Sequence, residues 1–248
     1  MGANMHKWLS VFCCAIALSA CDKHDPILPG VRTPVFDTAQ INVQNKTITQ
    51  IPNAAHVVDN SSCPYTQDSS NVIWDGPRKI FSGFPTGNTV SAKTYPVCSG
   101  KYLYAGLTTG ELVKLNPKTR QIIWIADIYR TSNMTGGASM VDIIAPIVPY
   151  KNAVYAGSLG DAFCRISAAS GDKQWCVNVG VGVPFVIADS YAFVVATDSN
   201  LYAISLQNGD VYWRQPVKSH VAPIYQDGKI IVGDEWFSIE NGKKVLDK

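Results

Sequence analysis

Three stretches of the chain repeat one pattern: LYAGLTTGELVKL at 103–115, VYAGSLGDAFCRI at 154–166 and FVVATDSNLYAI at 193–204. A tryptophan follows each stretch at nearly the same distance, as Trp124, Trp175 and Trp213. A fourth copy begins at Ile230 and has no matching tryptophan. Self-similarity at a fixed period is the signature of a repeat architecture, so this pattern decides the fold.

Each copy divides into four short apolar strands separated by turns. In the third copy the expected strands are 183–187, 192–196, 201–206 and 211–214. Runs such as Phe193–Val195 are apolar on successive residues, which indicates a sheet covered on both faces. Four-stranded antiparallel units that cover one another describe a β-propeller. We therefore predict an all-β fold in which residues 71–248 form about four blades, at roughly forty residues each.

The turns within the copies carry glycine. Asn208-Gly209 and Asn241-Gly242 suit a type I′ hairpin, which needs two positive φ angles. Gly171 is the matching residue of the second copy. The first copy has Lys118-Thr119-Arg120 and no glycine, so its turn type stays open.

The final copy lacks a tryptophan-bearing outer strand. The segment 72–74, Val-Ile-Trp, has the character of that strand. We expect Val72 to Trp74 to complete the last blade and close the ring, because propellers join their ends to avoid an open edge.

The recurrent Trp124, Trp175 and Trp213 have two interpretations. One indole per repeat at a fixed register suggests docking between neighbouring blades. The alternative is a stacked cofactor or an aromatic binding platform.

The N-terminus has the features of an export signal. His6 and Lys7 precede the uncharged apolar run 8–18, which is too short to span a bilayer. The run ends in Leu18-Ser19-Ala20-Cys21, which resembles the bacterial lipobox. That resemblance implies removal of residues 1–20 and acylation of Cys21, which becomes the first residue and anchors the chain to a membrane.

Two features follow the anchor. Asp22 resembles the inner-membrane retention signal of enteric lipoproteins, which leaves the inner membrane open as an address beside the outer membrane. Residues 21–70 are rich in Pro, Asn, Ser and Thr with little periodicity, so we expect a lipidated flexible tether there.

Four other cysteines remain in the exported chain. Cys164 and Cys176 flank the turn 169–172 and fall roughly opposite each other in an antiparallel hairpin, so a cross-strand disulfide is plausible. Cys63 with Cys98 is the pairing left over, and an even number suits an oxidising compartment. The alternative is four small buried thiols.

Composition and motifs exclude several classes. With 21 basic and 19 acidic residues, the near-neutral chain offers no electrostatic case for nucleic acid as the main partner. Its 16% charged residues, with many glycines and aromatics, disfavour a helical bundle. We find no spacing typical of a metal site or a nucleophile elbow, so we expect no cofactor, no metal and no catalytic residue.

The repeat resembles the pyrroloquinoline-quinone-type propeller repeat, and with the lipobox it is similar to the BamB-type β-barrel assembly lipoproteins. The tract 28–35, LPGVRTPV, is similar to the leader tract of alphaproteobacterial members. The family has eight blades, whereas this chain has room for about half.

The resemblance implies a non-catalytic periplasmic scaffold on the outer membrane. Its partners would be barrel-assembly machine subunits or unfolded outer-membrane proteins. The alternatives are a quinone-dependent dehydrogenase and an adaptor of another envelope complex. One class of such dehydrogenases uses adjacent oxidised cysteines, and the only adjacent pair here, Cys13-Cys14, lies in the leader.

Overall fold

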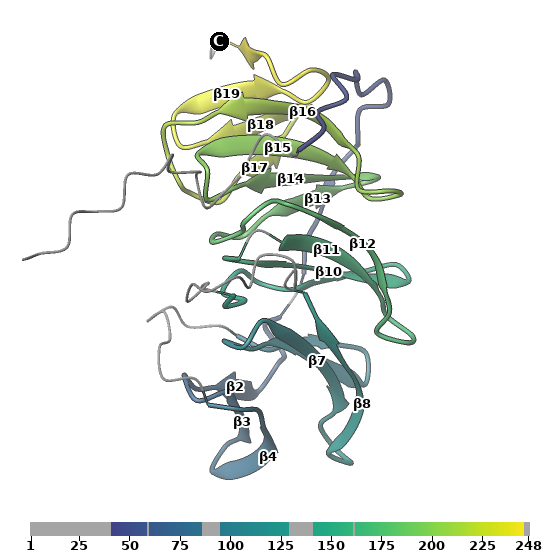
Figure 1. The fold of residues 1–248 in the computed structure, drawn as a ribbon, viewed down its shortest axis with the longest axis vertical. Coiled ribbons are helices and arrows are strands. Elements are labelled where there is room, and N and C mark those ends of the chain that lie inside the picture. The colour runs from purple at the N-terminus through teal and green to yellow at the C-terminus, as the bar shows by residue number, and fades with distance from the viewer. Residues whose placement is uncertain (1–40, 59, 86–94, 129–140, 161, 246–248) are drawn as a thin grey trace, which may run out of the picture. The chain divides into compact units, whose positions relative to one another are not determined.

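The computed structural model describes residues 41–58, 60–85, 95–128, 141–160 and 162–245. The chain divides into two units, 1–37 and 38–248, and the described residues all belong to the second. They form strands and turns throughout (Figure 1). Within the described ranges, no helix has the length and apolar character that crossing a membrane requires.

Four antiparallel sheets of four consecutive strands follow one another along the chain. In the first sheet the strands are β5 (Val97–Ser99), β6 (Tyr102–Gly106), β7 (Glu111–Asn116) and β8 (Gln121–Asp127). In the second they are β9 (Val148–Tyr150), β10 (Ala153–Ser158), β11 (Ala162–Ser167) and β12 (Lys173–Val177). In the third they are β13 (Val186–Ala188), β14 (Tyr191–Val195), β15 (Asn200–Ser205) and β16 (Val211–Pro216). In the fourth they are β17 (Ile224–Gln226), β18 (Lys229–Val232), β19 (Glu235–Ser238) and β20 (Lys244–Val245).

These sheets confirm the prediction of about four propeller blades of four strands each. The strands expected in the third copy overlap β13 to β16, with ends that differ by at most three residues.

A further sheet of three strands precedes the four. It contains β2 (Tyr65–Gln67), β3 (Val72–Asp75) and β4 (Arg78–Ser82), in that order. The expectation that Val72 to Trp74 completes the last blade is therefore wrong, because β3 pairs with β2 and β4 instead. The last blade has its own fourth strand, β20, which pairs with β19.

The three-stranded sheet matches the last three strands of a blade. Its β2–β3 hairpin has Asn71 at φ 61°, and the Asn71 carbonyl accepts a hydrogen bond from Gly83 N at 2.9 Å. The β6–β7 hairpin has Gly110 at φ 79°, and its carbonyl accepts from Ile128 N at 3.0 Å. β3 is thus a middle strand, which explains why its tryptophan misled the sequence interpretation.

The described part of the expected tether packs against the sheets. Val43 forms a parallel bridge with Val211, and β1 (Ala55–His56) pairs antiparallel with β13 as a fifth strand. Ile48 is fully buried, and Ile48 N donates to the Glu240 carbonyl at 2.8 Å. We call residues 41–58 and 60–63 the N-terminal strap. Polar composition hid the strap because its few packed apolar residues, such as Val43 and Ile48, are scattered among polar ones. Residues 21–40 of the expected tether lie outside the described residues.

Each hydrophobic cluster lies between two consecutive sheets. One joins Leu103 and Val113 to Ile73 of the three-stranded sheet. Three others join the first sheet to the second, the second to the third, and the third to the fourth. The successive residues Phe193 and Val194 belong to different clusters, so β14 is covered on both faces as its continuous apolar run predicts.

Ile48 tests whether the strap is part of the folded domain. Ile48→Ala should lower the free energy of unfolding by about 2–5 kcal/mol, the usual loss for a buried isoleucine. Urea unfolding measures the change. Ile51→Ala is the matched control, because Ile51 lies in the same segment and is 49% exposed whereas Ile48 is 1% exposed. Equal, small effects of both substitutions would show that the strap does not pack as described.

Candidate functional site

The three recurrent indoles lie in equivalent positions, each at the junction with the next sheet. Trp124 Nε1 donates to the Ala168 carbonyl at 3.2 Å, and Trp175 Nε1 donates to the Leu206 carbonyl at 3.3 Å. Trp213 Nε1 donates to the Ile239 carbonyl at 3.0 Å. Every acceptor belongs to the turn that joins the last two strands of the following sheet. The indole N–H thereby binds one sheet to the backbone of the next.

A glycine in each of these turns makes room for the indole. A Cβ added to Gly209, at φ 77°, would lie 2.9 Å from the Trp175 ring. The same addition at Gly171 would lie 2.8 Å from Trp124, and at Gly242 it would lie 2.5 Å from Trp213. Glycine is needed at each of these positions for two reasons: the backbone is left-handed, and the indole ring leaves no room for a Cβ.

These turns differ from the expected type I′ geometry. Gly209 N donates to the Ser205 carbonyl and Ser205 N donates to the Asp210 carbonyl, both at 2.9 Å, which closes a four-residue loop. Gly209 has a positive φ and Asn208 does not, whereas type I′ needs both. The Asn208 side chain instead accepts from Asp210 N at 3.2 Å.

The first blade explains why one copy lacks the glycine. Arg120 takes its place, at φ 59°. The preceding three-stranded sheet has no tryptophan on its outer strand β4, and Trp74 Nε1 donates to Asp68 within that sheet at 2.9 Å. Because no tryptophan of the described preceding sheet docks on this turn, a side chain at position 120 causes no clash with an indole ring.

Two basic residues also donate hydrogen bonds at the tryptophan contacts. The sequence interpretation did not identify them. Lys114 pairs across the strands with Trp124, and its Nζ donates to the same Ala168 carbonyl as the indole. Arg165 pairs with Trp175, and its guanidinium donates to the Leu206 carbonyl at 3.1 Å. Each basic residue stands ten positions before its tryptophan, and this spacing is the signal that could have found them. In the third blade the equivalent partner of Trp213 is Ala203.

Lys114 lies among aromatic rings. Its ammonium lies 4.1 Å from the ring centre of Tyr102 and 5.9 Å from that of Trp124, within the range of a cation–π contact. Burial lowers the pKa of Lys114 below its ordinary value, while the neighbouring Tyr102 opposes that shift. The docking site therefore holds a partly desolvated cation against a backbone carbonyl.

The four cysteines of the described chain form two disulfides. Cys164 and Cys176 face each other directly in the β11–β12 ladder, with Cα atoms 4.1 Å apart. Cys63 is bonded to Cys98 on β5, across 35 residues of sequence. Cys21 and Asp22 lie outside the described residues.

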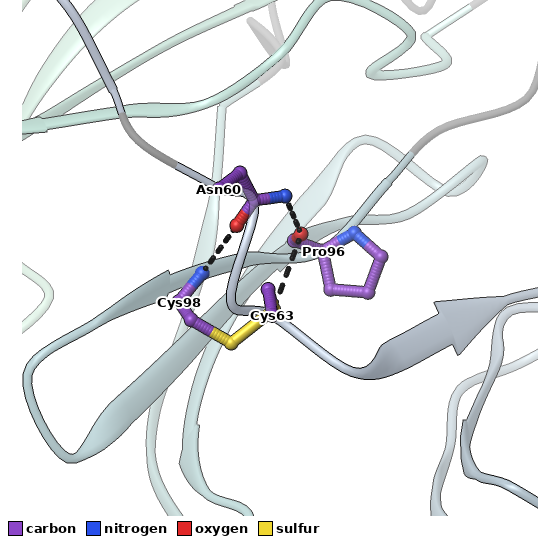
Figure 2. Close-up of a disulfide and its surroundings, with 4 residues drawn as sticks. All are labelled: Asn60, Cys63, Pro96 and Cys98. Carbon is purple, nitrogen blue, oxygen red and sulfur yellow. Dashed lines mark hydrogen bonds between the residues drawn. A yellow bond between two sulfur atoms is a disulfide. The ribbon is translucent and has the colours of Figure 1, made fainter.

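The Cys63–Cys98 bond fastens the end of the strap (Figure 2). Asn60 lies beside it and spans the same strand: Asn60 Nδ2 donates to the Pro96 carbonyl at 2.8 Å, and Asn60 Oδ1 accepts from Cys98 N at 3.0 Å. One side chain thus mimics a strand partner for β5, and the disulfide makes the contact covalent.

The strap reaches the first strand of all four blades in reverse order. The Tyr225 hydroxyl of β17 donates to the Pro52 carbonyl, and β1 pairs with β13. His56 Nε2 donates to the Pro149 carbonyl of β9 at 3.2 Å, and Asn60 binds β5. The strap therefore links four sheet edges that pair with no other strand among the described residues.

The titratable side chains of the described ranges can be compared with the spacings that metal sites need. Within the described ranges, no group of three His, Cys, Asp or Glu residues is placed to hold a metal ion. His56 binds a backbone carbonyl, and His220 lies 3.0 Å from Ser199 Oγ in an exposed turn.

Comparison with known proteins identifies the family to which this chain belongs. The sequence profile of the family described as outer membrane protein assembly factor BamB matches residues 29–215, and again residues 164–236. The chain belongs to the BamB family. It is 26% identical over 166 residues to BamB of Alkalilimnicola ehrlichii, and the match covers 63% of this chain and 43% of that protein.

Solved structures agree on the fold. BamB from Moraxella catarrhalis aligns with a TM-score of 0.61 at 13% identity, covering 73% of this chain and 59% of that one. A quinohemoprotein alcohol dehydrogenase from Pseudomonas putida aligns with a TM-score of 0.53 at 13% identity, covering 82% and 43%. At these identities both structures show the propeller fold alone. Compared with the curated BamB relatives, this chain spans about two fifths of their length.

The Trp–Gly docking contact is testable by adding one methyl group. Gly209→Ala must strain the left-handed backbone and also displace the Trp175 ring. Gly100→Ala is the matched control, because Gly100 has φ 58° and nothing lies within 4 Å of an added Cβ. Gly209→Ala should lower the free energy of unfolding by about 1–3 kcal/mol more than Gly100→Ala, the usual penalty for overpacking. Equal losses in urea unfolding would show that the indole does not press on the turn.

The two disulfides should differ in their contribution to stability. The Cys63–Cys98 bond closes 35 residues and the Cys164–Cys176 bond closes 12. In the chain-entropy description, replacing the first pair by alanine should cost about 4 kcal/mol and the second about 3 kcal/mol. Replacing the first pair should also expose the strap near Val57 to limited proteolysis, and replacing the second should not. Identical digestion patterns would contradict the assignment of the first disulfide as the fastener of the strap.

Proposed function

We propose that this protein is a non-catalytic periplasmic lipoprotein that assists the assembly of outer-membrane β-barrel proteins through protein–protein contacts. The observation that carries the proposal is the BamB-family match over residues 29–215, three quarters of the chain. The relatives it resembles are named as outer membrane protein assembly factors. Because this chain spans under half of their length, its partners and activity are part of the proposal.

The use of the reactive side chains supports a scaffold. In the docking sites, indole, ammonium and guanidinium groups bind backbone carbonyls of the neighbouring sheet. The cysteines of the described chain are paired in disulfides. These groups hold blades together, and the loops and outer strands remain as the surfaces for partners. Strand edges suit such a role because main-chain hydrogen bonds give affinity without chemistry.

The anchor is the second part of the proposal. Cys21 carries the lipid, and the chain is held at the periplasmic face of the outer membrane. Acyl chains stabilise membrane attachment by roughly 0.8 kcal/mol per buried CH₂, so a multiply acylated cysteine needs no spanning helix. Asp22 is the residue that would direct the lipoprotein to the inner membrane instead, and Asp22→Ser is the substitution that tests its influence in envelope fractionation.

A pull-down tests the partnership. The full-length chain with a C-terminal tag is crosslinked in intact cells, purified from detergent-solubilised envelopes and probed for the core subunit of the barrel-assembly machine. We expect the core subunit to copurify with the full chain. A fusion of residues 1–40 to an unrelated periplasmic domain is the control, because it has the anchor and lacks the blades.

Three outcomes would contradict the proposal. Equal recovery of the core subunit with the anchor-only fusion would remove the assembly role. Binding of pyrroloquinoline quinone with Ca²⁺ by the purified chain, together with oxidation of an alcohol, would assign the chain to the dehydrogenases. Recovery of the blades with a different envelope complex would make it an adaptor of that complex.

A further inference from the structure

The outer strand of the first blade exposes three isoleucines. Ile122, Ile123 and Ile125 of β8 are 47%, 36% and 47% exposed, whereas their neighbours Trp124 and Ala126 are buried against the second blade. Among the described residues, β8 pairs with β7 alone, so its other edge has no strand partner. An exposed apolar edge strand is a template for pairing with another chain, which most proteins avoid.

At two of these three positions the second and third blades have no aliphatic residue, and the counterpart of Ile122 in β16 is Val211, which is only 2% exposed. Counted from the docking tryptophan, Ile123 and Ile125 correspond to Gln174 and Cys176 in β12. In β16 the same positions are Tyr212 and Arg214. The apolar edge is thus a property of the first blade and not of the repeat.

The chain itself shows how such an edge accepts a strand. The strap runs parallel to β16 where Val43 bridges Val211. Gln44 N donates to the Val211 carbonyl at 2.8 Å, and Lys46 N donates to the Tyr212 carbonyl at 3.0 Å. Counted from Trp213, Val211 and Tyr212 are the counterparts of Ile122 and Ile123. The added segment therefore occupies on β16 the place that is open on β8.

Charge distinguishes the two edges. On β16, the Lys46 ammonium forms an ion pair with Asp210 at 3.1 Å, just before the strand begins. The counterpart of Asp210 before Trp124 is the uncharged Gln121, and the turn that precedes it has the exposed basic residues Lys118 and Arg120. A segment that docks on β8 in the same way should therefore have an acidic residue where the strap has Lys46.

We propose that the outer edge of β8, at Ile122–Ile125, binds an extended segment of a partner protein by parallel strand addition. The segment has apolar side chains at alternate positions and an acidic residue that meets the Lys118–Arg120 turn. This inference adds a binding surface to the proposed scaffold function. Only the identity of the partner depends on that proposed function. The surface itself is testable with synthetic peptides.

Methyl NMR of the full-length chain, labelled at isoleucine δ1 and held in detergent, locates the peptide. The probe is an eight-residue peptide with the sequence of residues 41–48 and glutamate in place of Lys46. We expect the Ile122, Ile123 and Ile125 methyl signals to shift during titration, and the unaltered lysine peptide to bind several-fold more weakly. A nitroxide at the N-terminus of the probe should broaden Ile122 more than Ile125, which reports parallel addition.

Paired substitutions test the edge directly. Ile123→Lys with Ile125→Lys places charges on the edge and should weaken peptide binding by about tenfold or more. Gln174→Lys, at the matching position of β12, should leave the affinity unchanged. Circular dichroism shows whether each variant is folded. If the double-lysine variant does not fold, the methyl shifts of the unsubstituted chain alone test whether the peptide binds β8.

Several outcomes would overturn the proposal. Absence of methyl shifts up to the solubility limit of the peptide, or equal binding by the double-lysine variant, would show that β8 accepts no strand. Equal affinity for the two peptides would remove the acidic specificity. A dimer in sedimentation that the double substitution dissociates would identify a second copy as the occupant. These results are independent of the pull-down, which tests the assembly role itself.

Discussion

The contact between an indole and the backbone turn of the next sheet is the constraint on which the rest of this structure depends. A blade with two apolar faces cannot be stable alone, so each sheet needs neighbours on both sides. The indole N–H fixes how the sheets stack because it donates to one particular carbonyl, as Trp175 does to Leu206. The turn glycine leaves room for the ring, and Lys114 or Arg165 adds a second donor to the same carbonyl. Where no indole arrives, Arg120 replaces the glycine.

The N-terminal strap covers strand edges that the stacking of the sheets leaves open. Each blade begins with an edge strand that, among the described residues, has no partner from another blade on its free side. The strap contacts all four of these strands, as a paired strand on β13 and elsewhere through hydrogen bonds that involve the side chains of Tyr225, His56 and Asn60. Its far end is fixed to β5 by the Cys63–Cys98 disulfide. Such cover protects strand edges from pairing with other chains. Among the outer strands the strap adds only to β16, and β8 differs from β12 in its three exposed isoleucines.

Much of this architecture could be predicted from the sequence because periodicity and spacing are local signals. Four sheets, the strands of the third blade and the facing of Cys164 and Cys176 follow from the repeat and its turns. The position of Trp74 could not be predicted, because a middle strand and an outer strand with one tryptophan look alike. Asn-Gly fits both a type I′ turn and a four-residue loop with one left-handed residue, so the dipeptide alone does not decide between them. The strap was missed because its few apolar residues, such as Ile48, are scattered among polar ones.

Hydrogen exchange of the tryptophan side chains tests the docking contact most directly. Trp124, Trp175 and Trp213 donate their indole N–H to carbonyls of the neighbouring sheet, while Trp74 donates to the exposed Asp68 within its own sheet. NMR of the folded chain in D₂O follows each indole proton separately. The account predicts that the three docked protons exchange slowly, through opening of the stacked sheets, and that the Trp74 proton exchanges quickly. Exchange of all four at the same fast rate would contradict it.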